Sequence, residues 1–370
     1  MHIVHVGKYY WPYHRGIETY LKLLCERLCR EVELEVLVTH PSFRTWRETV
    51  NGVRVTRMGR IAEVRSMSIC PSLPLLLRRL KPDIVHIHLP NPWAEWCYFL
   101  AGAPGKLVVS LHSDIIRQQL LLHLHKGMHD RFLRRAAKVI VASPRHIEFS
   151  PFLSRLPEGK CVVIPYGIEP EQFARRDDAA IAGIIGQTGT PLVLFAGHLV
   201  YYKGVEILID AAAQLKAHVA IVGAGPLEQV LRARAAERGI GPRIHFLGDV
   251  DDATLRAAYQ ACDVFCLPST QRSEAFGIVQ LEAFAAGKPV VSTNLPSGVP
   301  FVNRDGETGL VVPPGDAGAL ATALGSLLTD PARRAAMGSA AQARVRDLFT
   351  ADRMAADTLA VYRSVLCQGR

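Results

Sequence analysis

An α/β protein of two doubly wound domains is the fold class that the sequence predicts, each domain being a parallel β-sheet with helices on both faces. The 370 residues exceed the ~100–150 residues that are typical of one domain. Short β-branched runs alternate with helix-length segments along the chain, which is typical of βαβ units around a parallel sheet. The segment Ile168–Thr190 interrupts this alternation with charges, glycine and threonine, and therefore predicts a boundary between two domains.

The first domain is expected over residues 1–170. The chain opens on a strand, His-Ile-Val-His-Val, and the helix-length segment Glu18–Arg30 follows it. Similar segments separate the later strands, so successive strands can form parallel βαβ units. The strands of this domain are expected at His2–Val6, Leu34–Thr39, Asp83–His88, Lys106–His112, Lys138–Ala142 and Cys161–Pro165.

A linker is expected over 171–190 and a second domain over 191–349. Helices are expected between its strands, for example at Val205–Lys216, Leu227–Arg238 and Thr254–Ala261. Ligands of doubly wound sheets bind at the C-terminal ends of the strands, so we expect the site where those ends of the two sheets face each other. The strands of the second domain are expected at Leu192–Gly197, His218–Gly223, Arg243–Leu247, Asp263–Leu267, Pro289–Thr293 and Gly309–Val312.

The composition is that of an ordinary folded protein. With 49% hydrophobic, 21% charged and 7% aromatic residues, the chain differs from disordered and collagen-like sequences. Its 8 cysteines form no C-x-x-C pair and no cysteine–histidine ligand spacing, so we expect reduced thiols in a cytoplasmic protein. The N-terminus lacks the features of a signal peptide and no apolar run reaches ~18 residues, so neither secretion nor a membrane span is expected.

Two glutamates mark the most informative stretch of the second domain. Glu274 lies in a polar loop after a strand, and Glu282 lies in the following helix, which we expect to begin near Gly277. The free amides of Gly277, Ile278 and Val279 at the start of that helix favour an anion. Two carboxylates that can accept sugar hydroxyls on either side of an anion site suit a nucleotide sugar.

Two further loops of the second domain add a cation and a glycine turn. Lys203 lies in the loop after the first strand of this domain, where it can meet a diphosphate. Gly223 and Gly225 follow the next strand and leave room for a flat base to approach the backbone. The turn lacks the third glycine of the dinucleotide-binding motif, so a dinucleotide is not expected.

The first domain offers candidates of its own. Arg15 and Gly16, in the loop after the first strand, can bring a cation and an amide to a phosphate. His88 and His112 end two strands, and strand ends border the ligand crevice of such sheets. Tyr13, in the same loop as Arg15, and His88 are the candidates for the acceptor side.

Together these segments resemble a known family. The stretch Ser273–Glu282 with Ala-Gly-Lys-Pro-Val-Val after it, the Lys203-Gly204 pair and Gly16-Ile-Glu are similar to the retaining glycosyltransferases of family 4, which have the GT-B fold. The resemblance covers nearly the whole chain. It implies that Glu282 binds the ribose of a nucleotide-sugar donor, that Glu274 binds the hexose, and that Lys203 meets the diphosphate.

The resemblance also implies that His112 lines the reaction centre, which makes His112, Glu274 and Lys203 the candidate catalytic residues. No metal and no cofactor is expected, because protein cations and helix ends can neutralise the leaving diphosphate. A C-terminal helix within 350–370 is expected to cross back to the first domain. The donor-binding candidates are Arg15, Gly16, His198, Gly223, Gly225, Arg272, Ala275, Phe276, Gly277, Ile278, Val279 and Glu282.

Two positions depart from the family pattern. His198 stands after Gly197 where the family usually has arginine, and Arg15 precedes Gly16 where it often has a second glycine. One diphosphate-binding cation is therefore lost from its usual place. We expect Arg15, Arg272 or a protonated His198 to supply the missing charge.

The expected reaction is hexose transfer with retention of configuration, in which a donor phosphate oxygen accepts the acceptor's proton, because no enzymic nucleophile lies in an obvious position. The run Val291–Pro300 is similar to members that make bacterial surface polysaccharides, many of them mannosyltransferases. GDP-mannose is thus the expected donor, and a hydroxyl of a glycan or lipid-linked acceptor its target. The alternatives are UDP-glucose or UDP-N-acetylglucosamine with a small acceptor, and a sugar-nucleotide epimerase of the same fold.

The charge is uneven and suggests an anionic partner. Residues 1–170 carry 24 Lys and Arg against 14 Asp and Glu, whereas residues 171–370 carry 19 against 20. The segment Ile115–Lys138 mixes basic and apolar residues and can lie on anionic lipid at the inner face of the plasma membrane, although a domain helix with a solvated basic side explains it as well. Nucleic acid is not expected, because the arginines are not interleaved with stacking aromatics.

Overall fold

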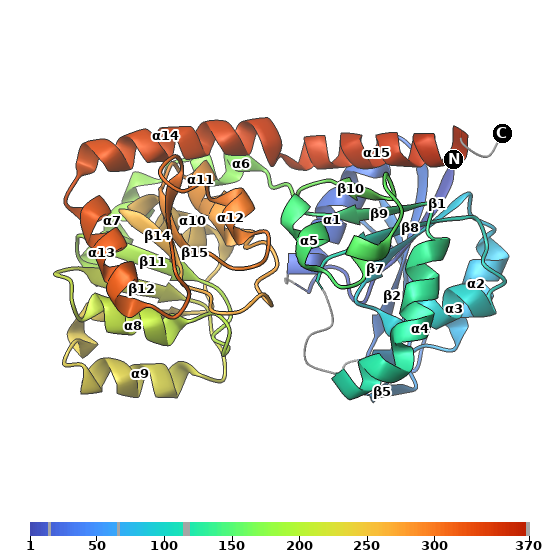
Figure 1. Ribbon diagram of the computed structural model, residues 1–370, viewed down its shortest axis with the longest axis horizontal. Helices are drawn as coiled ribbons and strands as arrows, with labels where there is room; N and C mark the ends of the chain where they lie inside the picture. Colours follow the sequence, from blue (N-terminus) through green and yellow to red (C-terminus); the bar gives the residue numbers. More distant parts are fainter. Residues whose placement is uncertain (14–15, 65–66, 114–118, 368–370) are drawn as a thin grey trace. The chain divides into compact units, whose positions relative to one another are not determined.

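The computed structural model describes residues 1–13, 16–64, 67–113 and 119–367, with only the backbone of 119–125, and divides the chain into two compact units (Figure 1). Unit 1 comprises residues 1–167 and the C-terminal segment from Ala351, and unit 2 comprises Ile168–Thr350. Each unit is an α/β fold around a mainly parallel sheet, so the predicted fold class is confirmed.

Unit 1 is built on an eight-stranded sheet and a separate two-stranded one. Its helices are α1 (Gly16–Leu28), α2 (Ser72–Leu80), α3 (Pro92–Leu100), α4 (Gln119–Arg135), α5 (Pro144–Phe149) and α15 (Ala351–Cys367), with a 3-10 turn at Leu153–Arg155. Its strands are β1 (His2–Val6), β2 (Glu33–His40), β3 (Trp46–Val50), β4 (Val53–Gly59), β5 (Ala62–Val64), β6 (Met67–Ile69), β7 (Ile84–Leu89), β8 (Lys106–Leu111), β9 (Lys138–Val141) and β10 (Cys161–Val163). The large sheet has the order β10-β9-β8-β7-β1-β2-β4-β3, parallel except for the β3–β4 pair, and β5 pairs with β6.

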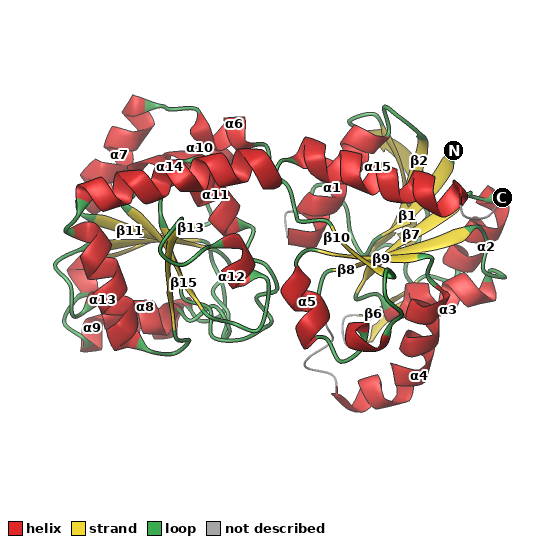
Figure 2. Cartoon of the chain, turned by 45° about the horizontal axis from the view of Figure 1, so that its top comes forward, coloured by secondary structure: helices red, strands yellow, loops and turns green. Residues whose placement is uncertain are grey.

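The two faces of the large sheet of unit 1 differ in chemistry. On one face Val4, Val85, Ile87 and Val109 form an apolar core with α2, α3 and α4. Helices α1 and α15 cover the other face (Figure 2). Because side chains alternate along a strand, the residues between these valines and isoleucines point to that second face. Several of those residues are histidines.

Unit 2 is built on a six-stranded, fully parallel sheet. Its helices are α6 (Pro170–Ala174), α7 (Asp178–Thr188), α8 (Val205–Ala212), α9 (Glu228–Glu237), α10 (Asp252–Ala261), α11 (Val279–Ala285), α12 (Val299–Val302), α13 (Ala317–Leu328) and α14 (Pro331–Leu348), with a 3-10 turn at Gly241–Arg243. Its strands are β11 (Leu192–Ala196), β12 (His218–Val222), β13 (Ile244–Gly248), β14 (Val264–Leu267), β15 (Val290–Thr293) and β16 (Gly309–Val312). The order β13-β12-β11-β14-β15-β16 reverses direction at β11, and the C-terminal ends of β11 and β14 flank that switch point, where ligands of such sheets bind.

The segment 171–190 is not the linker that the sequence predicted. It is mostly helical and belongs to unit 2, because Ile181 and Ile184 are buried on one side of α7. The Asp177 carboxylate caps α7 by accepting the Ala180 amide at 3.1 Å. The charges that suggested a linker lie in the exposed turn between α6 and α7 and at the first residue of α7, and the glycines lie on the exposed side of α7 or directly after it. Composition therefore concealed the helical spacing of the isoleucines.

The C-terminal segment and one hairpin complete unit 1. Helix α15 packs against α1, and the Arg27 Nε donates to Asp352 Oδ1 at 2.5 Å. The β3–β4 hairpin was absent from the predicted strands, although Asn51 and Gly52, with φ of 49° and 85°, form the Asn-Gly turn that favours a hairpin. The β5–β6 pair was likewise absent from the predicted strands, so periodicity alone revealed neither this edge of the large sheet nor the two-stranded sheet.

Candidate active site

A polar site in unit 2 lies at the C-terminal ends of the neighbouring strands β11 and β14. Lys203 lies in the loop after β11, and Glu274 lies in the loop after β14. The Lys203 Nζ is 2.6 Å from Glu274 Oε2, and both side chains are almost buried. The Ser269 hydroxyl donates to the same carboxylate oxygen at 3.1 Å. Adjacent parallel strands end at the same edge of a sheet, which is how the fold brings these distant residues together.

A glycine permits this close approach. Gly204 has a φ of +66°, and a Cβ at this position would lie 2.1 Å from the Pro268 carbonyl oxygen. Glycine therefore lets the loop before α8 rest on the loop after β14, where the Thr270 amide donates to the Tyr202 carbonyl at 2.8 Å. This backbone contact places Lys203, which precedes Gly204, beside Glu274.

The ion pair keeps the lysine charged. Burial alone would lower the pKa of Lys203, but the charge of Glu274, with contributions from Tyr202 and Glu282, outweighs burial and raises the pKa. Lys203 is therefore a cation at neutral pH. A cation held between a strand end and a helix start can bind a phosphate oxygen.

A second carboxylate of unit 2, Glu282 on α11, is held by a tyrosine. Its Oε2 accepts the hydroxyl of Tyr259, on α10, at 2.7 Å. Burial raises the pKa of Glu282, and the hydrogen bond from Tyr259 acts in the opposite direction. A carboxylate oriented in this way can accept hydroxyl groups of a sugar. Sequence reasoning identified Glu282 but missed Tyr259 and Ser269, which no motif distinguishes.

The stretch between the two glutamates turns into α11 at Gly277, where φ is +74°. The helix begins at Val279, two residues later than expected. The amides of Gln280 and Leu281 donate to the Gly277 and Ile278 carbonyls at 2.9 and 2.8 Å, so the amides that can face a ligand are those of the preceding residues. The Ala275 carbonyl accepts the Gly298 amide at 2.7 Å, and the Phe276 ring is buried in the core. Phe276 can therefore contribute to a ligand site only through its backbone.

The glycine turn after β12 packs against the chain itself. A Cβ at Gly223 would lie 2.3 Å from the Gly197 carbonyl oxygen, and one at Gly225 would lie 2.5 Å from the Leu199 carbonyl oxygen. The contact between these two backbone segments is sufficient to require glycine. Room for a flat base is thus not needed to explain the two glycines, and base binding there stays a prediction.

Two exposed side chains of unit 2 are candidates for the missing cation. His198 follows β11, and Arg272 precedes α11. Neither side chain forms a hydrogen bond or an ion pair with another residue of the described ranges. Arg15, the third candidate, lies outside the described residues. Of the two described candidates, Arg272 carries a permanent charge.

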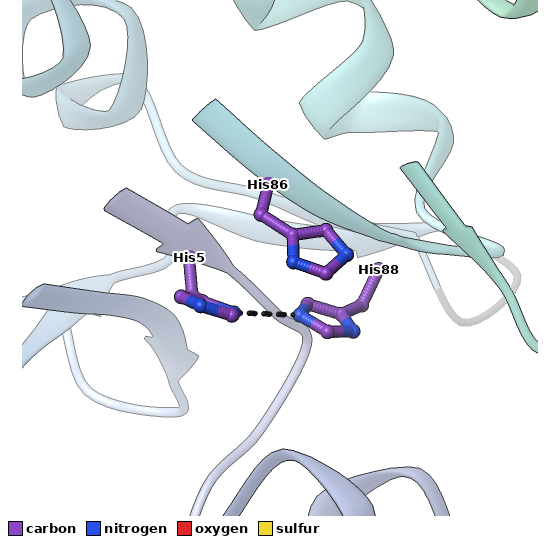
Figure 3. Close-up of side chains that lie close together, drawn as sticks. All are labelled: His5, His86 and His88. Carbon is purple, nitrogen blue, oxygen red and sulfur yellow. Dashed lines mark hydrogen bonds between the residues drawn. The ribbon is translucent and has the colours of Figure 1, made fainter. Parts of the chain in front are cut away.

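On the polar face of the unit 1 sheet, four histidines form a buried cluster. His5 on β1 pairs in register with His86 on β7, and His88 lies two residues further along β7. Figure 3 shows the His5 ring pointing toward His88, and the His5 Nδ1 is 3.0 Å from the His88 Nε2. The His112 ring stacks on His88 with centroids 5.4 Å apart.

The cluster belongs to a longer run of hydrogen bonds, which we call the histidine chain. Two tyrosines and a serine extend it, and Tyr362 enters it from α15. Its links are Ser110 Oγ to His86 Nε2 (2.8 Å), His86 Nδ1 to Tyr362 OH (2.5 Å), Tyr362 OH to His5 Nε2 (3.1 Å), His5 Nδ1 to His88 Nε2 (3.0 Å), His88 Nδ1 to His112 Nε2 (3.1 Å) and His112 Nδ1 to Tyr166 OH (2.7 Å).

Burial keeps the histidines of this chain neutral at physiological pH. It lowers the pKa of His5 and of His112 to about 3. It also lowers the pKa values of His86 and His88 well below the usual range, with a further contribution from the neighbouring imidazoles. The described residues contain one group of three potential metal ligands, the rings of His5, His86 and His88, whose atoms lie within 4.8 Å of one another. Every nitrogen of that group is already hydrogen-bonded, so a metal would have to displace those bonds.

The predicted site residues of unit 1 have different positions. His112 is 4% exposed, and its ring nitrogens are engaged by Tyr166 and His88. His88 is 2% exposed and has no nitrogen left for an acceptor, which argues against the predicted acceptor contact. Tyr13 is exposed and stacks on the neighbouring Tyr9 ring, and Gly16 begins α1.

The basic segment 115–138 is partly described. Phe132 and Leu133 on α4 are buried in the core, and the basic residues around them are exposed. For these residues the apolar side of the helix faces the protein, which fits the alternative interpretation of a domain helix with a solvated basic side. In the described part of the chain, no helix is long and apolar enough to cross a bilayer. Arg117 lies outside the described residues.

Comparison with protein-family models gives two matches that together cover most of the chain. Residues 180–344 match the glycosyl transferases group 1 model, and residues 14–172 match the glycosyltransferase family 4 model. A D-rhamnosyltransferase, WbpZ, of Pseudomonas aeruginosa is 40% identical over 73% of this chain and 70% of its own length. An O-antigen chain mannosyltransferase C of Escherichia coli is 31% identical over 99% of both chains.

Solved structures resemble the fold at lower identity. A sucrose-phosphate synthase of Thermosynechococcus elongatus superposes with a TM-score of 0.83 at 24% identity, over 99% of both chains. The Anabaena protein HepE in complex with UDP superposes with a TM-score of 0.81 at 21% identity, over 98% of this chain and 100% of HepE. These similarities identify the fold as GT-B.

Proposed function

Because the chain belongs to the glycosyltransferases that the group 1 and family 4 models describe, we propose that it moves a hexose from a nucleotide-diphosphate sugar to a hydroxyl of a glycan or lipid-linked acceptor. The observation that carries this proposal is the Lys203–Glu274 pair at the switch point of the unit 2 sheet. The O-antigen chain mannosyltransferase, which matches over 99% of its length, supports mannose as the transferred sugar and a bacterial surface glycan as product, and GDP-mannose is the donor that we propose.

The side chains of unit 2 take complementary roles in this proposal. Lys203 binds the diphosphate, with Arg272 and the amides at the start of α11 as further positive groups. Glu282 accepts the ribose hydroxyls, and Glu274 accepts those of the hexose. Before the donor binds, the pairing of Lys203 with Glu274 prevents either charge from being buried alone.

The transfer proceeds with retention and without a metal. The acceptor oxygen bonds to the anomeric carbon on the face from which the diphosphate departs, and a diphosphate oxygen takes the acceptor proton. Protein cations stabilise the leaving charge. An EDTA-treated enzyme is expected to keep its activity, and nuclear magnetic resonance of the product is expected to show the anomeric configuration of the donor. Loss of activity restored by Mg²⁺, or an inverted product, would contradict this mechanism.

The donor is tested by thermal unfolding with GDP, UDP, ADP, GDP-mannose, UDP-glucose and UDP-N-acetylglucosamine. A ligand that binds only the folded protein at ~100 Kd adds ~2.7 kcal/mol of stability. Stabilisation by the guanosine series alone, lost in Glu282→Ala, supports GDP-mannose. Stabilisation by UDP compounds instead favours the UDP-sugar alternative, and conversion of a donor to its epimer without acceptor favours the epimerase.

We also propose that unit 1 contacts an anionic membrane surface through charge. Lys126, Arg131, Arg134 and Arg135 are exposed on α4, and each cation near such a surface adds ~1 kcal/mol. Flotation with phosphatidylglycerol vesicles at low salt is expected to recover the wild-type protein but not an Arg131→Glu/Arg134→Glu variant. Equal recovery of both proteins would remove these arginines from the proposal.

A further inference from the structure

The proposed transfer reaction does not explain the histidine chain. It runs from Ser110 to Tyr166 through the interior of unit 1 and includes Tyr362, which lies on α15 far along the sequence from the strands. Figure 3 shows three of its histidines, His5, His86 and His88. All four of its histidines are at most 4% exposed. Such a network stabilises a buried core only if each of its members is satisfied.

Neutral imidazoles give this network a single direction. A neutral histidine donates from one ring nitrogen and accepts at the other, and a hydroxyl donates once. Every ring nitrogen of the histidine chain has a partner within it. Because a ring that accepts at one nitrogen must donate from the other, the direction of one link sets the direction of all the links from Tyr362 through His5, His88 and His112 to Tyr166. The direction passes across Tyr362 to His86 when the Tyr362 hydroxyl donates its proton within the chain, which also satisfies that buried donor. The network therefore has two fully bonded arrangements, with all protons on Nε2 or all on Nδ1.

The lengths of the bonds favour one arrangement. Hydrogen bonds donated by O–H groups are shorter than those donated by N–H groups. The tyrosine contacts to Nδ1 are short, 2.5 Å from Tyr362 to His86 and 2.7 Å from Tyr166 to His112. The Tyr362 contact to His5 Nε2 is longer, at 3.1 Å. The Ser110 Oγ–His86 Nε2 contact, at 2.8 Å, fits either donor, but both tyrosine contacts to Nδ1 fit O–H donors, which is the arrangement with the histidine protons on Nε2.

We propose that Tyr362 is a positioning residue that holds His112, three links away, in the Nε2–H tautomer. The Tyr362 oxygen accepts the N–H of His5, so His5 must accept from His88, and His88 must accept from His112. In this state the Nδ1 of His112 accepts the hydroxyl of Tyr166 and fixes its direction. A role in catalysis rests on the proposed glycosyl transfer, in which His112 lines the reaction centre.

Removal of the Tyr362 hydroxyl should reverse part of the network. In Tyr362→Phe, the Nε2–H of His5 would be a buried donor without an acceptor, which is more costly than an acceptor without a donor. His5, His88 and His112 can avoid this by moving their protons to Nδ1, after which His112 donates to Tyr166. The cost of an unsatisfied buried N–H corresponds to a shift in the tautomer ratio of about 10- to 100-fold.

Nitrogen-15 resonances of the histidine rings test the reversal, because protonated and bare ring nitrogens differ widely in chemical shift. The full chain is labelled with ¹⁵N-histidine, and its rings are assigned from His→Gln variants. Wild-type His5, His88 and His112 are expected to carry Nε2–H, and Tyr362→Phe is expected to show Nδ1–H at all three. Tyr166→Phe is the matched comparison: it removes a donor rather than an acceptor, so these rings should keep Nε2–H. Tyr98→Phe removes a buried hydroxyl outside the chain, bonded to the Gly105 carbonyl, and should alter none of them.

Other outcomes overturn the proposal. Unchanged tautomers in Tyr362→Phe would show that the links are not cooperative, and reversal in Tyr166→Phe instead would show the opposite direction. Stoichiometric zinc in the purified protein, found by elemental analysis, would mean that the ring nitrogens bind a metal. If Tyr362→Phe does not fold, the wild-type spectrum and Tyr166→Phe still test the Nε2–H assignment.

Kinetics separate this inference from the proposed function. With a donor and acceptor that support turnover, Tyr362→Phe is expected to lower kcat about 10-fold or more with little change in the KM of the donor, whereas Tyr98→Phe keeps the wild-type rate. A reversed tautomer with an unchanged kcat would contradict the positioning role. If no donor supports turnover, the proposed function fails, but the tautomers in the spectra still decide whether Tyr362 sets His112.

Discussion

The Lys203–Glu274 pair and the histidine chain bury polar side chains in opposite ways. In unit 2, Lys203 and Glu274 are buried as charges, each compensated by the other at 2.6 Å. In unit 1, the histidines are buried without charge, and hydrogen bonds replace the water that they have lost. The first arrangement fails when one charge is removed, and the second fails when a charge is added. The comparison predicts different sensitivities to mutation and to pH.

Acid is expected to have the largest effect, and to act on unit 1. The pKa of His5 and of His112 is about 3 in the folded state, against 6.5 in the unfolded chain. Between these values the unfolded chain binds more protons, so stability falls as the pH falls below 6.5. Each histidine contributes about 1.4 kcal/mol per pH unit within this range, which is about 2.8 kcal/mol per pH unit for the two together.

Tryptophan fluorescence measures this effect, because all 4 tryptophans, at positions 11, 46, 93 and 96, lie in unit 1. The urea midpoint of the fluorescence transition is expected to be lower at pH 5 than at pH 7. The described residues of unit 2 contain no cluster of buried neutral histidines, so its share of the circular-dichroism transition should move less. Equal fluorescence midpoints at the two pH values would mean that the histidines are not buried as neutral groups.

Removal of one partner of the ion pair is expected to have the next largest effect, and to act on unit 2. Lys203→Met leaves the Glu274 carboxylate buried without its cation, at a cost of about 3 kcal/mol in the free energy of unfolding. The double variant Lys203→Met/Glu274→Gln removes both charges and should recover part of that loss. Urea unfolding monitored by circular dichroism gives the free energy of unfolding of the wild type, the two single variants and the double variant, which form a double-mutant cycle. Additive losses would show that the pair is not coupled, and the fluorescence transition of unit 1 is the internal control.

The sequence predicted the chemistry of unit 2 better than that of unit 1, for a physical reason. Glu274 and Glu282 belong to one contiguous motif, and Lys203 lies in the loop that follows a recognisable strand, so local reading was sufficient to select them. Their contact follows from the pairing of β11 with β14, which local reading of the sequence did not reveal. Tyr259 has no such motif, because only the packing of α10 against its neighbours brings it to Glu282.

The histidine chain could not be read from the sequence. His88 and His112 were identified, but His5, His86 and Tyr362 become their partners only when β1, β7 and β8 are known to be neighbours and α15 to lie over them. The one local signal was the spacing of two in His-Ile-His on β7, which places both rings on the same face. Likewise, the helices within 171–190 depend on burial of Ile181 and Ile184 against unit 2, which overrides a composition typical of linkers.

Removal of the Tyr259 hydroxyl is expected to have a smaller effect that sharpens the comparison inside unit 2. Its hydrogen bond lowers the pKa of Glu282, so Tyr259→Phe should raise that pKa and cost about 1.5 kcal/mol of stability. As the pH is lowered, nucleotide binding by Tyr259→Phe should therefore begin to weaken at a higher pH than nucleotide binding by the wild type. Titration calorimetry between pH 5 and 8 measures the shift. Parallel pH profiles for the two proteins would show that Tyr259 does not control the carboxylate.

The smallest effect on stability is expected at the exposed cations, which tests whether burial is what makes the Lys203–Glu274 pair costly to break. Arg272 is exposed and has no ion-pair partner among the described residues, so Arg272→Ala should change the free energy of unfolding by less than about 0.5 kcal/mol. If Arg272 supplies the charge that the family usually places at position 198, the same substitution should weaken binding of the nucleotide-sugar donor about 5- to 10-fold, because a charge-assisted hydrogen bond to phosphate is lost.

His198→Ala is the matched comparison and should weaken binding less at pH 8 than at pH 6 if a protonated imidazole contributes. Weaker binding in His198→Ala alone would assign the charge to His198, and unchanged binding in both variants would leave Arg15 as the remaining candidate.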